Sequence, residues 1–203
     1  MCGQPVRVAD VGPSQDDAEL AAAVHAALPG RALVVRPGIV AGPHDPTNRF
    51  SAWVARGARG GRMLAPGAPD RPLQLVDARD LAAFVLDLTA AGTTGVYNAV
   101  GSPALTWGAM LGACASSGAG AELVWVPDET LAAAGVGEEQ LPLWIAANDR
   151  DNAGFMRIDG ARAVAGGLRN RPITETARDT RAALRPEDGL GLDPALEARL
   201  TGA

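Results

Sequence analysis

The loop at residues 43–50, PHDPTNRF, carries the side chains best suited to chemistry. His44 stands next to Asp45, and a histidine beside a carboxylate can act as a general acid and base near neutral pH. This adjacency predicts His44 and Asp45 as a catalytic pair. Loops also hold many polar residues without a chemical role, so a histidine that only satisfies backbone groups is the simpler alternative.

A second set of residues suits recognition rather than proton transfer. Arginine, glutamine and asparagine side chains form paired hydrogen bonds with carboxylates, phosphates and polyols. Such side chains occur in the loop and beyond it, at Asn48, Arg49, Arg56, Gln74 and Arg79. They predict a binding site for a small polar or anionic molecule. An equally simple alternative is that Arg49 and Arg79 only stabilise the fold. Asp77 or Asp80 would then be their partners.

Several familiar site types are missing from the sequence. Two histidines and scattered acidic residues give no metal-ligand spacing, so no metal is predicted. No serine lies in a Gly-x-Ser-x-Gly elbow. The glycine-rich stretches 57–61 and 118–120 do not fall between a strand and a helix of a βαβ unit. Both are therefore interpreted as turns rather than phosphate-binding loops.

These side chains need a scaffold, which the hydrophobic pattern predicts. Continuous apolar runs, typical of strands covered on both faces, predict strands at 32–36, 73–76, 96–100 and 122–126. Capping residues and amphipathic spacing predict helices at 14–28, 50–59, 79–91, 105–117, 128–134, 159–166, 173–184 and 194–200. Residues 62–72 are predicted as a Pro/Gly-rich connection and 135–157 as irregular. The alternation indicates an α/β fold with a reduced, partly parallel sheet and flanking helices.

The composition sets limits on location and partners. The chain has 203 residues, 47% of them hydrophobic and 20% charged, which is enough for one domain with a real core. The formal net charge of −5 and the lack of an arginine run give no support to a nucleic-acid partner. No signal peptide or membrane-length apolar run is recognised, so a cytoplasmic protein without a membrane partner is predicted.

The cysteines and linkers do not divide the chain. Cys2 and Cys114 are too few for a disulfide framework, and Cys114 lies in a helix of small residues where burial is expected. The sequence shows no repeat and no low-complexity linker. A single domain over residues 1–203 is therefore predicted.

Colinear motifs carry a family resemblance. They are ALVVRPGIVAGP at 32–43, LQLVDARDLAAF at 73–84, GVYNAVG at 95–101 and GLRNRPITETARDT at 167–180. In this order they resemble the C-terminal, substrate-domain half of an extended short-chain dehydrogenase/reductase of the NAD-dependent epimerase/dehydratase family, in an actinobacterial reductase-like group. The resemblance implies a truncated Rossmann-like fold. It divides the single domain into a remnant of the catalytic-helix region, the substrate-domain half and a tail helix region, at 1–31, 32–184 and 185–203.

The sequence departs from the family where the family holds its catalytic residues and cofactor. The family's helix before the first strand opens with Tyr-x-x-x-Lys, and Val11 and Gln15 occupy those positions here. Valine has no proton to give, and glutamine cannot lower a tyrosine pKa as an ammonium does. No glycine-rich loop precedes strand 32–36. No cofactor is therefore predicted. Pro37 and Gly38 would lie beside the nicotinamide of NAD or NADP only if a nucleotide-binding half were supplied.

The same resemblance implies that loop 43–50 faces a substrate. It places the segments of three polar candidates along the same cleft, namely Arg56, Gln74 and Arg79. It also adds three aromatic side chains to the predicted binding residues, namely Phe50, Trp53 and Trp144. Trp144 would form a wall of the cleft, and burial in the core is the alternative for each tryptophan.

Three functions remain open at this point. In the first, the chain binds a small molecule or performs cofactor-independent chemistry, with His44 and Asp45 as acid and base and Arg49 and Gln74 orienting the substrate. In the second, it is an NAD(P)-dependent reductase or epimerase whose nucleotide-binding half belongs to another chain or is missing from the gene model. In the third, the exposed edge of strand 32–36 pairs with a partner, which predicts a homodimer or heteromer.

Overall fold

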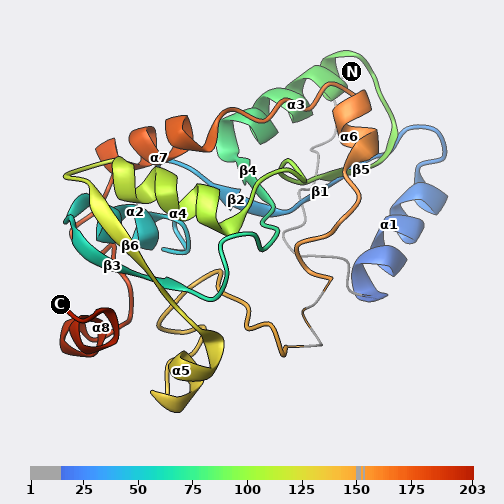
Figure 1. Cartoon of the computed structure of the whole chain (residues 1–203). Coiled ribbons are helices and arrows are strands. Elements are labelled where there is room, and N and C mark those ends of the chain that lie inside the picture. The colour runs from blue at the N-terminus through green and yellow to red at the C-terminus, as the bar shows by residue number, and fades with distance from the viewer. Residues whose placement is uncertain (1–14, 150–151, 153) are drawn as a thin grey trace. The chain divides into compact units, whose positions relative to one another are not determined.

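The computed structural model describes residues 15–149, 152 and 154–203. Its strands are β1 Leu33–Pro37, β2 Ile39–Ala41, β3 Gly61–Pro66, β4 Leu75–Asp77, β5 Gly95–Ala99 and β6 Ala121–Val126 (Figure 1). Its helices are α1 Gln15–Ala27, α2 Ser51–Ala58, α3 Ala78–Ala90, α4 Trp107–Ser116, α5 Asp128–Ala133, α6 Ala161–Ala165, α7 Ile173–Ala182 and α8 Pro194–Thr201. Helices and strands alternate along the chain, which confirms the predicted α/β class. The predictions on Cys2 and Val11 lie outside the described residues.

Two strands differ from the sequence-based expectation. Residues 62–72 are predicted as a connection, but β3 occupies Gly61–Pro66 and pairs with β6. Only three consecutive apolar residues lie in this strand before its proline, so the local pattern is too short to indicate it. The short strand β2 directly follows Gly38 and is also absent from the prediction. The other predicted elements are present, with ends shifted by no more than two residues.

The contacts separate the chain into two units, each assembled from three stretches of sequence. Unit 1 holds the described parts of 1–40, 74–103 and 157–170, and unit 2 holds those of 41–73, 104–156 and 171–203. Each unit has its own pair of parallel strands. The single domain expected from the sequence, with its internal boundaries, stays a prediction.

Unit 1 is built on the parallel strands β1 and β5, which run side by side in Figure 1. Their register begins with Leu33 opposite Gly95 and ends with Pro37 opposite Ala99. Helices α3 and α6 contact these strands, and apolar side chains fill the contact. The buried members of this cluster are Val35, Val76, Phe84, Leu88, Tyr97, Ala99, Ala163 and Leu168. Their burial stabilises the pairing of segments that are distant in sequence.

Helix α3 begins directly after β4 because Asp77 caps it. The Asp77 carboxylate accepts a hydrogen bond from the Arg79 backbone N–H at 2.9 Å. The Arg79 guanidinium turns back to the same carboxylate, with Nε 2.9 Å from Oδ1 and Nη2 2.8 Å from Oδ2. The structure thus contains the Arg79–Asp77 pair of the alternative, fold-stabilising interpretation.

Unit 2 is built on the parallel strands β3 and β6, whose register begins with Gly61 opposite Ala121. Helices α2, α4 and α7 pack on one another beside this pair (Figure 1). Trp53 of α2 and Trp107 of α4 meet edge to face, with ring centroids 5.4 Å apart. The Trp107 indole N–H donates to the Pro66 carbonyl oxygen at 2.9 Å. Two buried indoles therefore join the helices to each other and to β3.

A glycine sets the close approach of α2 to α4. A Cβ atom at position 57 would lie 2.2 Å from the carbonyl oxygen of Cys114, so Gly57 has no room for a side chain. Cys114 is fully buried at this contact, as its small-residue helix predicts. Burial raises the pKa of the Cys114 thiol above its ordinary value, which favours the uncharged form.

Candidate functional site

The carboxylate of Asp45 organises the loop between β2 and α2. Its Oδ1 accepts hydrogen bonds from the backbone N–H of Thr47 at 2.9 Å and from the Thr47 hydroxyl at 2.6 Å. Its Oδ2 accepts from the backbone N–H groups of Phe50 at 2.9 Å and Ser51 at 3.3 Å. The last two donors stand at the N-terminus of α2, whose own N-cap residue makes no side-chain cap. Asp45 therefore caps the helix from six residues upstream.

These hydrogen bonds decide the charge state of Asp45. Burial alone would raise the pKa of the carboxyl, but the hydrogen bonds from Thr47, Phe50 and Ser51 outweigh burial and hold the pKa below its usual value. The neighbouring His44 is exposed and has a positive φ of 63°. Among the described residues, no hydrogen bond or ion pair joins the His44 imidazole to Asp45. His44 and Asp45 are therefore neighbours in the sequence, but their side chains make no hydrogen bond to each other in the structure.

The rest of the loop is held mainly by contacts within unit 2. The Asn48 side chain bonds both backbone groups of Gly189, donating to its oxygen at 2.8 Å and accepting from its nitrogen at 3.2 Å. Phe50 is completely buried. Arg49 is exposed, and its Nε donates to the Thr47 hydroxyl at 3.1 Å. Of the predicted binding residues in this loop, Arg49 alone presents its side chain to solvent.

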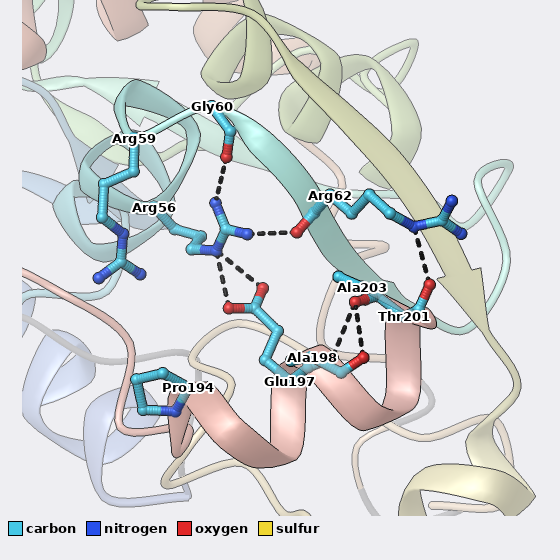
Figure 2. Close-up of a pocket in the computed structure, with 9 residues that line it drawn as sticks. All are labelled: Arg56, Arg59, Gly60, Arg62, Pro194, Glu197, Ala198, Thr201 and Ala203. Atoms are coloured by element: carbon cyan, nitrogen blue, oxygen red, sulfur yellow. Dashed lines mark hydrogen bonds and ion pairs between the residues drawn. The ribbon is translucent and has the colours of Figure 1, made fainter.

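Arg56 lies at the end of α2 and binds a carboxylate from the far end of the sequence (Figure 2). Its Nε donates to both oxygens of Glu197 at 2.8 Å. Its Nη1 donates to the Gly60 carbonyl at 3.0 Å and its Nη2 to the Arg62 carbonyl. Glu197 Oε1 also accepts from the backbone N–H of Leu64 at 3.1 Å. Both side chains are buried, with 8% and 10% of their areas exposed, so the ion pair is shielded from solvent.

A pocket of about 340 Å³ opens beside this ion pair (Figure 2). It is lined by Arg56, Arg59, Gly60, Arg62, Pro194, Glu197, Ala198, Thr201 and Ala203. One wall is the turn from α2 into β3, and the other is α8. The lining side chains include three arginines and one glutamate, so the pocket carries a positive balance on a chain of net charge −5.

Two of these arginines keep capacity for a ligand. Arg59 is exposed, and its guanidinium makes no hydrogen bond or ion pair with any described residue. Arg62 donates from Nε to the Thr201 carbonyl at 2.8 Å, and its Nη1 lies 3.9 Å from Glu122 on the exposed surface. Its side chain remains 42% exposed. Guanidinium groups of this kind bind carboxylate and phosphate oxygens in pairs.

Gln74 and Arg79 belong to unit 1 and are engaged there. The Gln74 amide donates to the Ile158 carbonyl and accepts from the Ile158 backbone N–H, both at 2.9 Å. These two hydrogen bonds resemble those between neighbouring strands, and they hold the segment before α6 in place. With Arg79 bound to Asp77, both side chains have partners in their own unit.

The turn after β1 also lies in unit 1. The Gly38 N–H donates to the Ala99 carbonyl at 3.1 Å, and Pro37 is the last residue of β1. A Cβ at Gly38 would lie 3.2 Å from a methyl carbon of Val100, so the turn packs tightly against the strand end. The role of Pro37 and Gly38 beside a nicotinamide stays a prediction.

The two predicted tryptophans pack inside unit 2. Trp53 is fully buried, and its indole N–H donates to the Pro142 carbonyl at 2.7 Å. Trp144 is 5% exposed and donates to Asp128 Oδ1 at 3.2 Å. Burial favours a raised pKa for Asp128, but hydrogen bonds from Arg71 and its other donors lower the pKa below its usual value. Both indoles therefore anchor the irregular segment 135–149 to the rest of unit 2.

Three charged residues of the pocket are absent from the predicted site, namely Arg59, Arg62 and Glu197. Arg56, Arg59 and Arg62 recur at every third position, and this spacing was a usable signal for a basic cluster. Glu197 gave no signal because its partner Arg56 stands 141 positions away in the sequence. The pocket therefore unites one predicted binding residue with others that the loop-centred interpretation left out.

Two other classes of site are missing from the described part of the chain. No group of three or more His, Cys, Asp or Glu residues there lies close enough together to hold a metal ion. No helix in the same residues combines the length and apolar character needed to cross a bilayer.

Comparison with known proteins places the fold. No family model and no curated protein matches the sequence. Among solved structures, the chain is similar to RMD from Pseudomonas aeruginosa complexed with NADPH, with 20% identity and a TM-score of 0.54 over 81% of this chain and 51% of that one. It is similar to the UDP-glucose 4-epimerase of Thermus thermophilus in complex with NAD, with 19% identity and a TM-score of 0.52 over 83% and 51%.

A third similar structure is the UDP-N-acetylglucosamine 4-epimerase of Bacillus cereus, with 12% identity and a TM-score of 0.55 over 84% of this chain and 50% of that one. The chain thus spans about half the length of each of these three proteins. At such low identities the likeness concerns the fold. The predicted Rossmann-like α/β fold is confirmed, and this chain shares it with about half of each of these structures.

Proposed function

We propose that this chain is a small-molecule-binding protein that takes an anionic ligand in the arginine pocket of unit 2. The observation that carries the proposal is the cluster of Arg56, Arg59 and Arg62 around a cavity with a single carboxylate side chain. Glu197 neutralises Arg56, so Arg59 and Arg62 are the groups left to meet a ligand. Two guanidinium groups that line the same open pocket suit a phosphate or carboxylate group.

Binding has more support than acid–base catalysis. The Asp45 carboxylate is fully occupied by four donors, and its pKa is lowered, so it has little capacity to exchange a proton with a substrate near neutral pH. His44 alone remains available in the loop. Two of the similar structures contain NADPH or NAD, but the pocket proposed here lies in unit 2 and uses neither Pro37 nor Gly38.

Calorimetric titration with inorganic phosphate and pyrophosphate tests this proposal. Arg59→Gln removes the unpartnered guanidinium without breaking a described contact, and we expect affinity to fall about tenfold. Arg169→Gln, at an exposed position of unit 1, is the matched control and should bind like the original protein. The proposal is wrong if neither anion binds, or if both variants weaken binding equally, which would indicate nonspecific charge effects.

A second candidate keeps the redox function and rests on the edge of β1. Among the described strands, β1 pairs with β5 along one edge and with none along the other. Within β1, the Nε atom of Arg36 is buried without a hydrogen-bond partner. These features favour a missing neighbour, either a nucleotide-binding half that completes an NAD(P)-dependent reductase or epimerase, or a partner in a homodimer or heteromer.

Two measurements separate these alternatives. Titration with NAD⁺, NADH, NADP⁺ and NADPH should give saturable heat if the chain assembles a nucleotide site, and no heat if it lacks one. Sedimentation at micromolar concentration should show a dimer if the β1 edge pairs with a second copy. A compact monomer with no dinucleotide binding would leave the anion-binding proposal as the sole candidate.

A further inference from the structure

We infer that α8 is a detachable wall of the anion pocket and that Glu197 is the positioning residue that docks it. This inference rests on the proposed anion binding in unit 2. It assigns a role to a carboxylate that would otherwise be expected to repel an anionic ligand.

The most buried residues of helix α8 are polar. Its buried residues are Glu197 and Thr201, and no apolar residue of the helix itself is buried to the same degree. Glu197 binds Arg56, and the Thr201 carbonyl accepts from Arg62 Nε at 2.8 Å (Figure 2). Glu197 also accepts from the Leu64 backbone N–H. Helix α8 contacts β3 and β6 through this side. A helix held in this way detaches more readily than one held by a buried apolar stripe.

The same contacts shape the pocket. Pro194, Glu197, Ala198 and Thr201 form the α8 wall, and detachment of the helix would turn the cavity into an open surface. Glu197 also orients Arg56, because its carboxylate holds Nε while Nη1 and Nη2 reach backbone carbonyls. A ligand that contacts both walls therefore favours the docked state of α8 over the detached state.

Glu197 has two opposing effects on an anion. Its negative charge disfavours the ligand, but both of its oxygens already bind the Arg56 Nε at 2.8 Å, so much of that charge is compensated. Its docking of α8 favours the ligand by holding the α8 wall of the pocket in place. We expect the docking effect to be larger. Removal of the carboxylate should then weaken anion binding, which is opposite to what simple charge counting predicts.

Hydrogen exchange measured by mass spectrometry on the full chain, with and without inorganic phosphate, tests this inference together with calorimetry. In the original protein, phosphate should slow exchange of the α8 amides. In Glu197→Gln, exchange of α8 without phosphate should accelerate about tenfold, and phosphate affinity should fall by a similar factor. Glu197→Asp, which keeps the charge, should recover part of both. Glu138→Gln, at an exposed residue away from the pocket, should change neither.

The role of Glu197 and the proposed anion binding can fail independently. No phosphate or pyrophosphate binding to the original protein means that the anion-binding proposal itself has failed. Normal binding to the original protein, with equal or tighter binding to Glu197→Gln, overturns the role of Glu197 and leaves the pocket in place. Thermal unfolding of each variant, followed by circular dichroism, shows whether the loss of affinity occurs in a folded protein.

Discussion

Two buried carboxylates in unit 2, Asp45 and Glu197, differ in the kind of partner that they bind and in its distance along the chain. Asp45 accepts four hydrogen bonds from uncharged donors that all lie within six residues along the chain. Glu197 pairs with a guanidinium that lies 141 positions away. The first carboxylate shapes a loop and caps a helix, and the second fastens one part of the chain to another.

The difference shows what a buried charge depends on. Asp45 keeps its partners whenever the loop is formed, because they are its own neighbours in sequence. Glu197 has its partner only when α8 is docked, because Arg56 belongs to another element. A buried charge that loses its counter-ion is expensive, whereas a carboxylate solvated by backbone N–H groups is already satisfied. Substitutions that disturb the Glu197 pair should therefore change the free energy of unfolding more than substitutions of Asp45.

The largest effect is expected for Arg56→Met, which leaves Glu197 buried with the Leu64 N–H as its remaining donor. We expect the free energy of unfolding to fall by about 3–5 kcal/mol. Urea denaturation followed by circular dichroism measures this change.

The double variant Arg56→Met/Glu197→Met sharpens the result. Because it removes both charges and fills the volume with apolar atoms, it should recover most of the lost stability. Equal destabilisation of the single and double variants would mean that packing, rather than the unpaired charge, accounts for the loss.

A smaller effect is expected for Asp45→Asn. The amide places an N–H group where a donor now meets a carboxylate oxygen, so we expect a loss of about 1–3 kcal/mol. The pKa of Asp45 is lowered in the folded state, so its contribution is present above the ordinary value of 3.8 and is lost as pH falls through the folded pKa.

Stability measured against pH checks this sign. The original protein should lose stability below about pH 4 more steeply than Asp45→Asn, because the variant has no carboxylate to protonate. Parallel curves for the two proteins in this range would show that Asp45 contributes nothing through its charge.

The smallest effect is expected for Arg49→Gln. Arg49 is exposed and its contact is a single hydrogen bond to Thr47, so stability should change by no more than about 0.5 kcal/mol. Thermal unfolding measures this. A larger loss would show that the loop around Asp45 depends on Arg49, and would weaken the contrast between the two carboxylates.

The local elements of the fold could be predicted where the signal lies within the element. The apolar run within 32–36 and the capping residue Asp77 indicate β1 and α3 without knowledge of their neighbours. Strand β3 could not be predicted in this way, because its few apolar residues between Gly61 and Pro66 become a strand through pairing with β6.

The candidate site could be predicted less well, because residue type does not reveal which partner a side chain finds. Gln74 and Arg79 have the chemistry of ligand-binding residues, yet each is engaged by a neighbour in unit 1. Arg56 is a predicted binding residue that lines the pocket, and its role in binding stays a prediction. Its counter-ion Glu197 could not be found, because nothing in the sequence links positions so far apart.

The parallel pairing of β1 with β5, and of β3 with β6, has a consequence for how the protein folds. In each pair the strands are separated by about fifty-five residues of intervening chain, and closing this long loop costs entropy before the strands can pair. Folding is therefore expected to be slow for a protein of this size. During that interval unpaired strand edges are open to other molecules, so refolding yield should depend strongly on protein concentration.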